Sequence, residues 1–278
     1  MKLRLSLACL ALSGAMFFGS STLSAQDQGP LILAHRGGAH EYEENTMEAF
    51  RASYERGIRA FETDIRMTKD GVLVVLHDDS LDRTHHGSGA IESQNAADIK
   101  DVVTKKGEKL LFLEDLLNYF ADKPGVYIEL EMKTSNKNLY PDSRIDEYTK
   151  KLHALATPKK PEGSQYLFTS FDKRPLEAIR KLDAKAPMAF IKGQPLTPEF
   201  IAEAKAVGAT HIACKLSGTT RDAVIEAHKQ GLKVNVWPGR TIDDYYLARG
   251  LGVDVHCTDV PNYIISVKEY LDGVPQKK

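Results

Sequence analysis

Short apolar runs alternate with amphipathic stretches along most of the chain, and this alternation constrains the fold more than any other feature. Strands that alternate with helices indicate parallel β-α units. The runs that we expect to be strands are Leu31–His35, Ala60–Arg66, Val72–His77, Val126–Lys133, Tyr166–Ser170, Met188–Lys192, His211–Lys215, Leu232–Trp237 and Val253–Thr258. With Val72–His77 taken as an extra hairpin strand, eight parallel strands remain. The sequence therefore predicts an α/β fold, a TIM-type (β/α)8 barrel, which typically needs about 250 residues.

Stretches with the period of a helix fit between these runs. They are Asn45–Arg56, Arg144–Leu155, Arg174–Leu182, Pro198–Val207, Thr219–Gln230, Ile242–Arg249 and Pro261–Leu271. Several run into a glycine, among them Gly231 and Gly250, where we expect the helix to stop. No linker divides residues 26–278, so we predict a single barrel domain there, with a small insertion, Leu81–Leu113, after the second strand and its hairpin partner.

The first 25 residues have the order of a secretory signal peptide. Lys2 and Arg4 precede the apolar stretch Leu5–Phe18, and small and polar residues follow up to Ala25, after which we expect cleavage. The apolar stretch is too short to span a membrane. We therefore expect no stable membrane span, and export to the periplasm or out of the cell rather than a plain N-terminal anchor.

The charges of the chain are balanced. Its 278 residues include 37 Lys and Arg against 38 Asp and Glu, a formal net charge of -1. A general nucleic-acid-binding protein normally has a clear basic excess. The balance therefore argues against nucleic acid as a partner.

Acidic side chains gather at the carboxyl ends of the expected strands, where a barrel of this kind has its active site. Side chains alternate along a strand, so Glu62 and Asp64 share a face, and Glu131 lies on the same face of the neighbouring strand. Three converging carboxylates would repel one another unless a cation neutralised them. Ca²⁺ or Mg²⁺ fits better than zinc, because no Cys or His cluster accompanies the acids. Glu129 is a further inward-facing acid, one layer deeper.

Two histidines, His35 and His77, stand at strand ends, and each is followed by a charged residue. This repeated arrangement favours catalytic roles, because imidazole both accepts and donates a proton near neutral pH. Arg36 and Lys133 suit an anionic substrate beside a metal. We expect Trp237 to form a wall of the barrel mouth and to contact the substrate.

An ordered set of motifs resembles the glycerophosphodiester phosphodiesterase family. The motifs are Ala34-His35-Arg36-Gly37-Gly38, Glu44-Asn45-Thr46, Phe61-Glu62-Thr63-Asp64-Ile65, Thr68-Lys69-Asp70-Gly71, Leu76-His77-Asp78, Leu81-Asp82-Arg83-Thr84, Glu131-Met132-Lys133, Ser170-Phe171, Trp237, Gly252-Val253-Asp254 and Thr258-Asp259. The resemblance implies a hydrolase that cleaves small glycerophosphodiesters to glycerol 3-phosphate and an alcohol. It also implies a TIM-type barrel with one divalent cation on Glu62, Asp64 and Glu131. The same resemblance makes His35 and His77 the acid–base pair and places Arg36 and Lys133 on the phosphate.

The chain departs from the family pattern at two places. Glu43 stands where the family usually has Pro, and Pro238, Gly239 and Arg240 follow the tryptophan where the family often has Thr and, two positions further on, Asn. These departures leave the metal and histidine positions intact and leave the specificity for the alcohol open.

Two other functions fit parts of the pattern. A lysophospholipase D-like or phosphoinositide-cleaving phosphodiesterase on the same barrel would need an apolar rim, whereas the insertion Leu81–Leu113 is mostly polar. A non-catalytic periplasmic protein that binds phosphodiesters would not need the paired histidines. The sequence leaves open which histidine is the acid, and whether water or the substrate's own glycerol hydroxyl is the nucleophile.

Overall fold

The strands of the protein close into a barrel in the computed structural model, which describes residues 29–273. They are β1 (Leu31–Ala34), β2 (Ala60–Met67), β3 (Leu73–Val75), β4 (Tyr127–Met132), β5 (Gln165–Ser170), β6 (Met188–Ile191), β7 (His211–Lys215), β8 (Lys233–Gly239) and β9 (Val255–Thr258). Hydrogen bonds join them in the order β1-β9-β8-β7-β6-β5-β4-β2, and β1 also pairs with β2, so eight parallel strands form a closed ring. The predicted TIM-type barrel is confirmed. The expected signal peptide, residues 1–25, lies outside the described residues.

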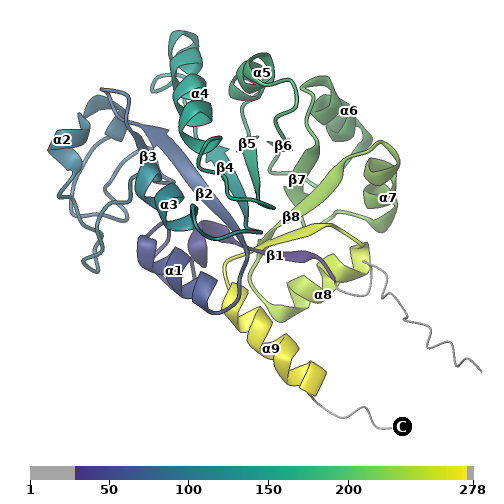
Figure 1. Cartoon of the computed structure of the whole chain (residues 1–278). Coiled ribbons are helices and arrows are strands. Elements are labelled where there is room, and N and C mark those ends of the chain that lie inside the picture. The colour runs from purple at the N-terminus through teal and green to yellow at the C-terminus, as the bar shows by residue number, and fades with distance from the viewer. Residues whose placement is uncertain (1–28, 274–278) are drawn as a thin grey trace, which may run out of the picture.

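The strand β3 stands outside this ring. It pairs antiparallel with β2, with Ile65 opposite Val75 and Met67 opposite Leu73, which is the predicted hairpin. The segment that follows includes the short helix α2 (Ala96–Ile99) and lies to one side of the barrel (Figure 1). With Val74 of β3 it forms a small apolar core, whose other members are Leu76, Leu81, Ile91, Ile99 and Leu110.

Helices cover the outside of the barrel (Figure 1). They are α1 (Met47–Glu55), α3 (Leu113–Phe120), α4 (Asp142–Ala156), α5 (Lys173–Leu182), α6 (Pro198–Ala206), α7 (Arg221–Lys229), α8 (Ile242–Leu251) and α9 (Pro261–Gly273). The helix α3 was not among those that we predicted. The expected stop at Gly250 was wrong, because α8 continues through it to a left-handed C-cap at Gly252, where φ is 77°. Within residues 29–273, no helix is long and apolar enough to span a bilayer.

The predicted two-residue alternation sorts the strand side chains between the two faces of the barrel wall. Phe61 on β2 and Ile128 on β4 face outward and pack in the main core between sheet and helices. The inward face carries a smaller apolar cluster, with Leu33 and Cys257 among its members, near the middle of the barrel. Each large apolar side chain buried in this way contributes about 1.5–3 kcal/mol to folding. This rigid wall holds the polar groups at its carboxyl end in place.

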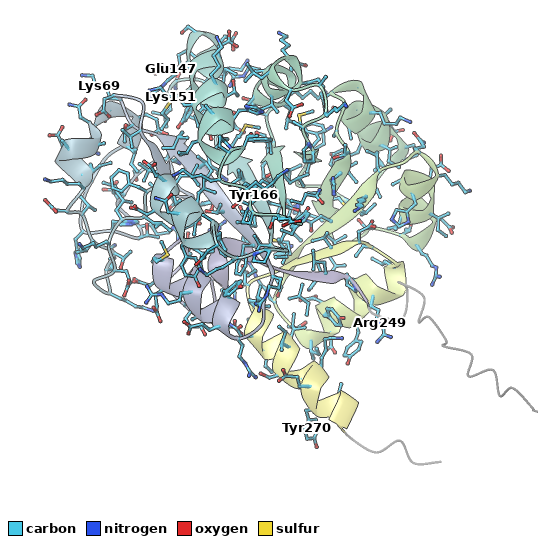
Figure 2. The ribbon with its side chains drawn as sticks, in the orientation of Figure 1. Lys69, Glu147, Lys151, Tyr166, Arg249 and Tyr270 are labelled. Carbon is cyan, nitrogen blue, oxygen red and sulfur yellow. The ribbon has the colours of Figure 1, made fainter. Side chains whose placement is uncertain are left out.

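The hairpin turn between β2 and β3 is anchored to α4. Glu147 and Lys151 lie on this helix (Figure 2), and their side chains form an ion pair of 3.3 Å. The Lys151 ammonium also donates a hydrogen bond of 3.0 Å to the carbonyl of Gly71, in the turn. The hairpin that leads to His77 is therefore held to the outer helical layer.

Candidate active site

A sharp turn follows β1 and carries two of the predicted site residues. His35–Gly37 form one turn of 3-10 helix in which Arg36 has a φ of 52° and Gly37 a φ of 83°. A Cβ at Gly37 would lie 2.8 Å from the Cβ of Ala49 on α1, so only glycine fits there. The turn lets the Arg36 backbone N–H donate a hydrogen bond of 3.1 Å to the Glu62 carboxylate. The turn after β1 and the strand β2 are thereby joined at the site.

Three carboxylates converge at the ends of β2 and β4. Asp64 and Glu131 are partners in the register of these strands, and Glu62 lies one layer below Asp64. One oxygen of each residue lies within 4.8 Å of the others, and all three side chains are buried. Oε1 of Glu62 and Oδ1 of Asp64 are buried and accept no hydrogen bond. An all-oxygen donor set with unsatisfied lone pairs fits a hard divalent cation such as Ca²⁺ or Mg²⁺.

Burial and the neighbouring charges set the pKa values of two members of the triad. Burial, followed by the charges of Asp64 and Glu131, holds the pKa of Glu62 well above its usual value. Burial would also raise the pKa of Asp64, but the cations Lys133 and Arg36 outweigh it and hold this pKa below the usual range. A divalent cation would stabilise the ionised form of every member of the triad.

Two cations border the triad. The Lys133 ammonium lies 2.7 Å from Oε1 of Glu131 and 3.4 Å from Oδ1 of Asp64. The Arg36 guanidinium lies 3.3 Å from Oδ2 of Asp64 and 3.0 Å from Oε1 of Glu44. Both side chains keep a small exposed fraction, 14% and 15%, so part of each faces the mouth of the barrel. They stand where a bound anion would meet positive charge.

Each predicted histidine binds an aspartate through the same ring atom. Nδ1 of His35 lies 2.5 Å from Oδ1 of Asp259, and Nδ1 of His77 lies 2.7 Å from Oδ1 of Asp78. Nε2 is therefore the ring atom left for a substrate in both histidines. Nε2 of His35 is 3.8 Å from the Glu62 carboxylate, so it faces the triad. Burial lowers the pKa of His77, and the opposing charge of Asp64 does not fully compensate.

Arginines hold both of these aspartates. Arg83, from the insertion, contacts Asp78 at 2.5 Å and Glu44 at 2.7 Å, and Arg240 contacts Asp259 at 3.1 Å. The hydrogen bond from Arg83 is the largest influence that lowers the pKa of Asp78, to about 2. Burial opposes the hydrogen bond from His35 at Asp259, but the pKa there is still lowered to about 2. Both aspartates remain ionised at neutral pH and can hold Nδ1–H of their histidine.

Trp237 lies in the last part of β8. It is the partner of Lys215 in the register of β8 and β7. Its ring is 5.7 Å from the ring of Phe171, edge to face, and Phe171 has an exposed fraction of 39%. The Lys133 ammonium is 6.0 Å from the centre of the Phe171 ring. The aromatic pair thus continues from the charged centre toward the mouth.

All eight predicted site residues therefore lie around one end of the barrel. Seven lie on or directly after the strands β1, β2, β4 and β8, and His77 follows the hairpin strand β3. The sequence interpretation missed three participants. Asn45 donates a hydrogen bond of 2.8 Å to Asp64, and Asp259 and Asp78 bind the histidines. Each of the three belongs to one of the motifs that carry the family resemblance, which was the available signal.

Comparison with known proteins gives a consistent result. Residues 35–263 match the model of the glycerophosphoryl diester phosphodiesterase family. A glycerophosphodiester phosphodiesterase of Bacillus subtilis (strain 168) is 30% identical over 206 residues, which are 65% of this chain and 68% of the relative. One of Bacillus altitudinis is 25% identical over 246 residues, 86% of this chain and 98% of the relative. An Oleispira antarctica phosphodiesterase, solved in complex with the product sn-glycerol-3-phosphate, has the same fold, with a TM-score of 0.78 and 20% identity; the match covers 87% of this chain and 98% of the other.

Proposed function

We propose that the chain, which belongs to the glycerophosphoryl diester phosphodiesterase family, hydrolyses its substrates with a divalent cation on Glu62, Asp64 and Glu131. The chain is a phosphodiesterase that acts on glycerophosphodiesters. We assign the acid–base steps to His35 and His77. The products are glycerol 3-phosphate and the free alcohol. The observation that carries the metal assignment is the convergence of three buried carboxylates, two of which keep an oxygen without a hydrogen-bond donor.

The chemistry that a divalent cation supplies at such a site is stabilisation of the negative charge that develops on the phosphate oxygens. Arg36 and Lys133 orient the phosphate from the sides of the triad, and Trp237 with Phe171 bounds the space next to it. Burial of the triad lowers the local dielectric constant, which strengthens each of these charge interactions.

The histidines move the protons. Nε2 of one neutral imidazole accepts a proton from the nucleophile, and Nε2 of the other, which is protonated as the imidazolium, donates a proton to the leaving alkoxide. Each such transfer typically contributes about 10²–10⁴-fold to the rate. Asp259 and Asp78 accept from Nδ1, which leaves Nε2 of each ring as the reactive nitrogen. The nucleophile is water or the glycerol hydroxyl of the substrate, and detection of a cyclic glycerol phosphate during turnover would identify the second.

A substrate panel with a chelator control tests the proposal. We expect hydrolysis of glycerophosphocholine, loss of that activity in EDTA, and recovery with Ca²⁺ or Mg²⁺. Preferential turnover of lysophosphatidylcholine would favour the lipid-cleaving alternative, and activity that is indifferent to the chelator would contradict the metal assignment.

The histidine assignment has its own test. His35→Ala and His77→Ala should each abolish turnover while the circular dichroism spectrum is unchanged. His228→Ala is a matched control, because His228 also pairs with an aspartate, at 2.8 Å from Asp254, but lies at the other end of the barrel. Wild-type turnover in either active-site variant, or binding of substrate without any product from the wild type, would contradict the assignment.

We propose further that the protein is exported and that its signal peptide is cleaved after Ala25. The support is the order of basic, apolar and small residues in 1–25. Expression in a bacterial host followed by fractionation and N-terminal sequencing tests this. A product that begins at Met1 and stays with the cytoplasmic fraction would contradict it.

A further inference from the structure

Lys215 stands at the mouth of the barrel, on the inward side of the wall. It ends β7, in which Ile212 and Cys214 belong to the core between sheet and helices. Side chains alternate along a strand, so Lys215 shares the inward face with His211 and Ala213. Lys215 is exposed, whereas the other residues of the strand are buried. Its ammonium therefore projects from the inner wall into the open end of the barrel.

The ring order places Lys215 across the barrel from the carboxylates. The strand β7 is four strands from β2 in either direction around the ring. Glu62 and Asp64, on β2, and Lys215, on β7, consequently face each other over the mouth. A substrate phosphate bound at the triad would present its remaining substituents toward the interior of this opening.

A chain of contacts connects the two sides across the opening, since Phe171 follows β5 and Trp237 lies on β8, with β6 and β7 between these strands. From the triad it runs through Lys133 to the ring of Phe171, 6.0 Å away, and from Phe171 to Trp237, whose ring is 5.7 Å further. Trp237 and Lys215 are partners in the register of β8 and β7. An alcohol that leaves the phosphate along this chain of contacts would pass over two aromatic rings and reach the ammonium group of Lys215.

The cations that border the triad and the two aspartates have acidic partners, as does Lys192, whereas Lys215 has none among residues 29–273. The paired cations and their partners are Arg36 with Asp64 and Glu44, Lys133 with Glu131 and Asp64, Arg83 with Asp78 and Glu44, Arg240 with Asp259, and Lys192 with Glu203. No carboxylate within residues 29–273 lies within ion-pairing distance of the Lys215 ammonium. Its charge remains available to a ligand.

We propose that Lys215, Phe171 and Trp237 form the subsite for the leaving alcohol, and that Lys215 selects glycerophosphodiesters whose alcohol carries a second anionic group, a carboxylate or a phosphate. This inference rests on the proposed function, because it names the substrate class for the same active site. A positive group at a fixed place in the mouth favours a complementary charge on the substrate and disfavours a cationic alcohol. The aromatic rings provide the apolar surface on which the carbon part of the alcohol lies.

The test uses two substrates that differ in one carboxylate. Glycerophosphoserine is glycerophosphoethanolamine with a carboxylate added to the alcohol, so the ratio of their kcat/KM values measures recognition of that group. With the enzyme loaded with Ca²⁺ or Mg²⁺, we expect the wild type to favour glycerophosphoserine by about five- to tenfold, as for a charge-assisted contact with partial exposure. In Lys215→Gln the ratio should fall to about one, and Lys215→Arg should retain most of the preference.

Lys192→Gln is the matched control, because Lys192 directly follows β6 at the mouth of the barrel but forms an ion pair with Glu203. It should leave the ratio as in the wild type. A second pair, glycerophosphoinositol and its 4-phosphate, shows whether a phosphate replaces the carboxylate; a preference in this pair alone would assign the subsite to phosphorylated alcohols.

Two results would overturn the inference. One is a wild type that favours the anionic member of neither pair. The other is a Lys215→Gln variant with an unchanged ratio; if that variant also loses activity equally on both members, Lys215 lies on the common glycerol phosphate part. Failure of the metal-loaded wild type to hydrolyse any of the four diesters would instead overturn the proposed function, and this inference with it.

Discussion

At alkaline pH the Glu129→Gln variant should be more stable than the wild type, because Glu129 is an acid buried within the barrel below the site. Its side chain has an exposed fraction of 2% and accepts hydrogen bonds from the Tyr127 hydroxyl at 2.7 Å and the Asn235 amide at 3.0 Å. Burial is the largest influence on it and raises its pKa from 4.5 to about 7, even though both hydrogen bonds act in the opposite direction. Ionised Glu129 is therefore a cost to the folded state.

The size of this cost follows from the pKa difference. Between pH 4.5 and 7 the folded protein holds a proton on Glu129 that the unfolded chain has lost, so the free energy of unfolding falls as pH rises. One pKa unit corresponds to about 1.4 kcal/mol, so the loss that is complete above pH 7 amounts to about 3 kcal/mol. Glutamine cannot ionise. It can accept from Tyr127, and a flipped Asn235 can offer its buried Oδ1, which has no partner, to the new amide.

Urea unfolding of the wild type and of Glu129→Gln, at pH 5 and pH 8 in EDTA, measures the effect. We expect the variant to gain about 2.5 kcal/mol relative to the wild type between the two pH values, because part of the loss has already occurred at pH 5. Every other titrating group is common to both proteins, so the double difference isolates Glu129. A double difference close to zero would show that Glu129 titrates normally and would refute this account of the barrel interior.

Three further perturbations probe the site itself. Glu62→Gln removes one negative charge from the triad. Isothermal titration calorimetry should show that Ca²⁺ and Mg²⁺ bind about 100-fold more weakly, as expected when one charged ligand is lost. An unchanged affinity would place the ion elsewhere. Asp259→Ala frees Nδ1 of His35, and kcat should fall by about 10–100-fold with little change in KM, whereas a change in KM alone would assign Asp259 to substrate binding. Gly37→Ala places a Cβ 2.8 Å from Ala49 at a φ of 83°, so urea unfolding should show a loss of about 1–3 kcal/mol together with lower kcat; a fully stable and active variant would show that the turn after β1 adapts freely.

The strands were predictable because the wall of a parallel barrel is buried and each strand appears as a short apolar run bounded by polar residues. The runs 60–66 and 211–215 differ from β2 and β7 by one residue at most. The helix α3 was missed although Leu113, Leu116, Leu117 and Phe120 have helical spacing and are buried. It begins directly after the polar insertion, whose predicted end is Leu113. The helical spacing of these apolar residues was therefore not distinguished from the loop.

The metal-binding triad was within reach of the sequence for a similar reason. Two-residue alternation within one strand places Glu62 beside Asp64, and parallel register between neighbouring strands adds Glu131. The partners of the histidines follow from no such local rule. Asp259 is 224 residues from His35 in the sequence, and only closure of the barrel between β1 and β9 brings them together.

The contacts of Arg83 give the insertion a part in the chemistry of the enzyme. Through Arg83 the insertion contacts Asp78, which binds the imidazole of His77. Through the same side chain it contacts Glu44, the partner of Arg36. Exchange of this loop for one of another length would therefore alter the basicity of a reactive nitrogen as well as the shape of the entrance. Selection or design that acts only on the loop can in this way retune the pH range of the enzyme while the barrel stays the same.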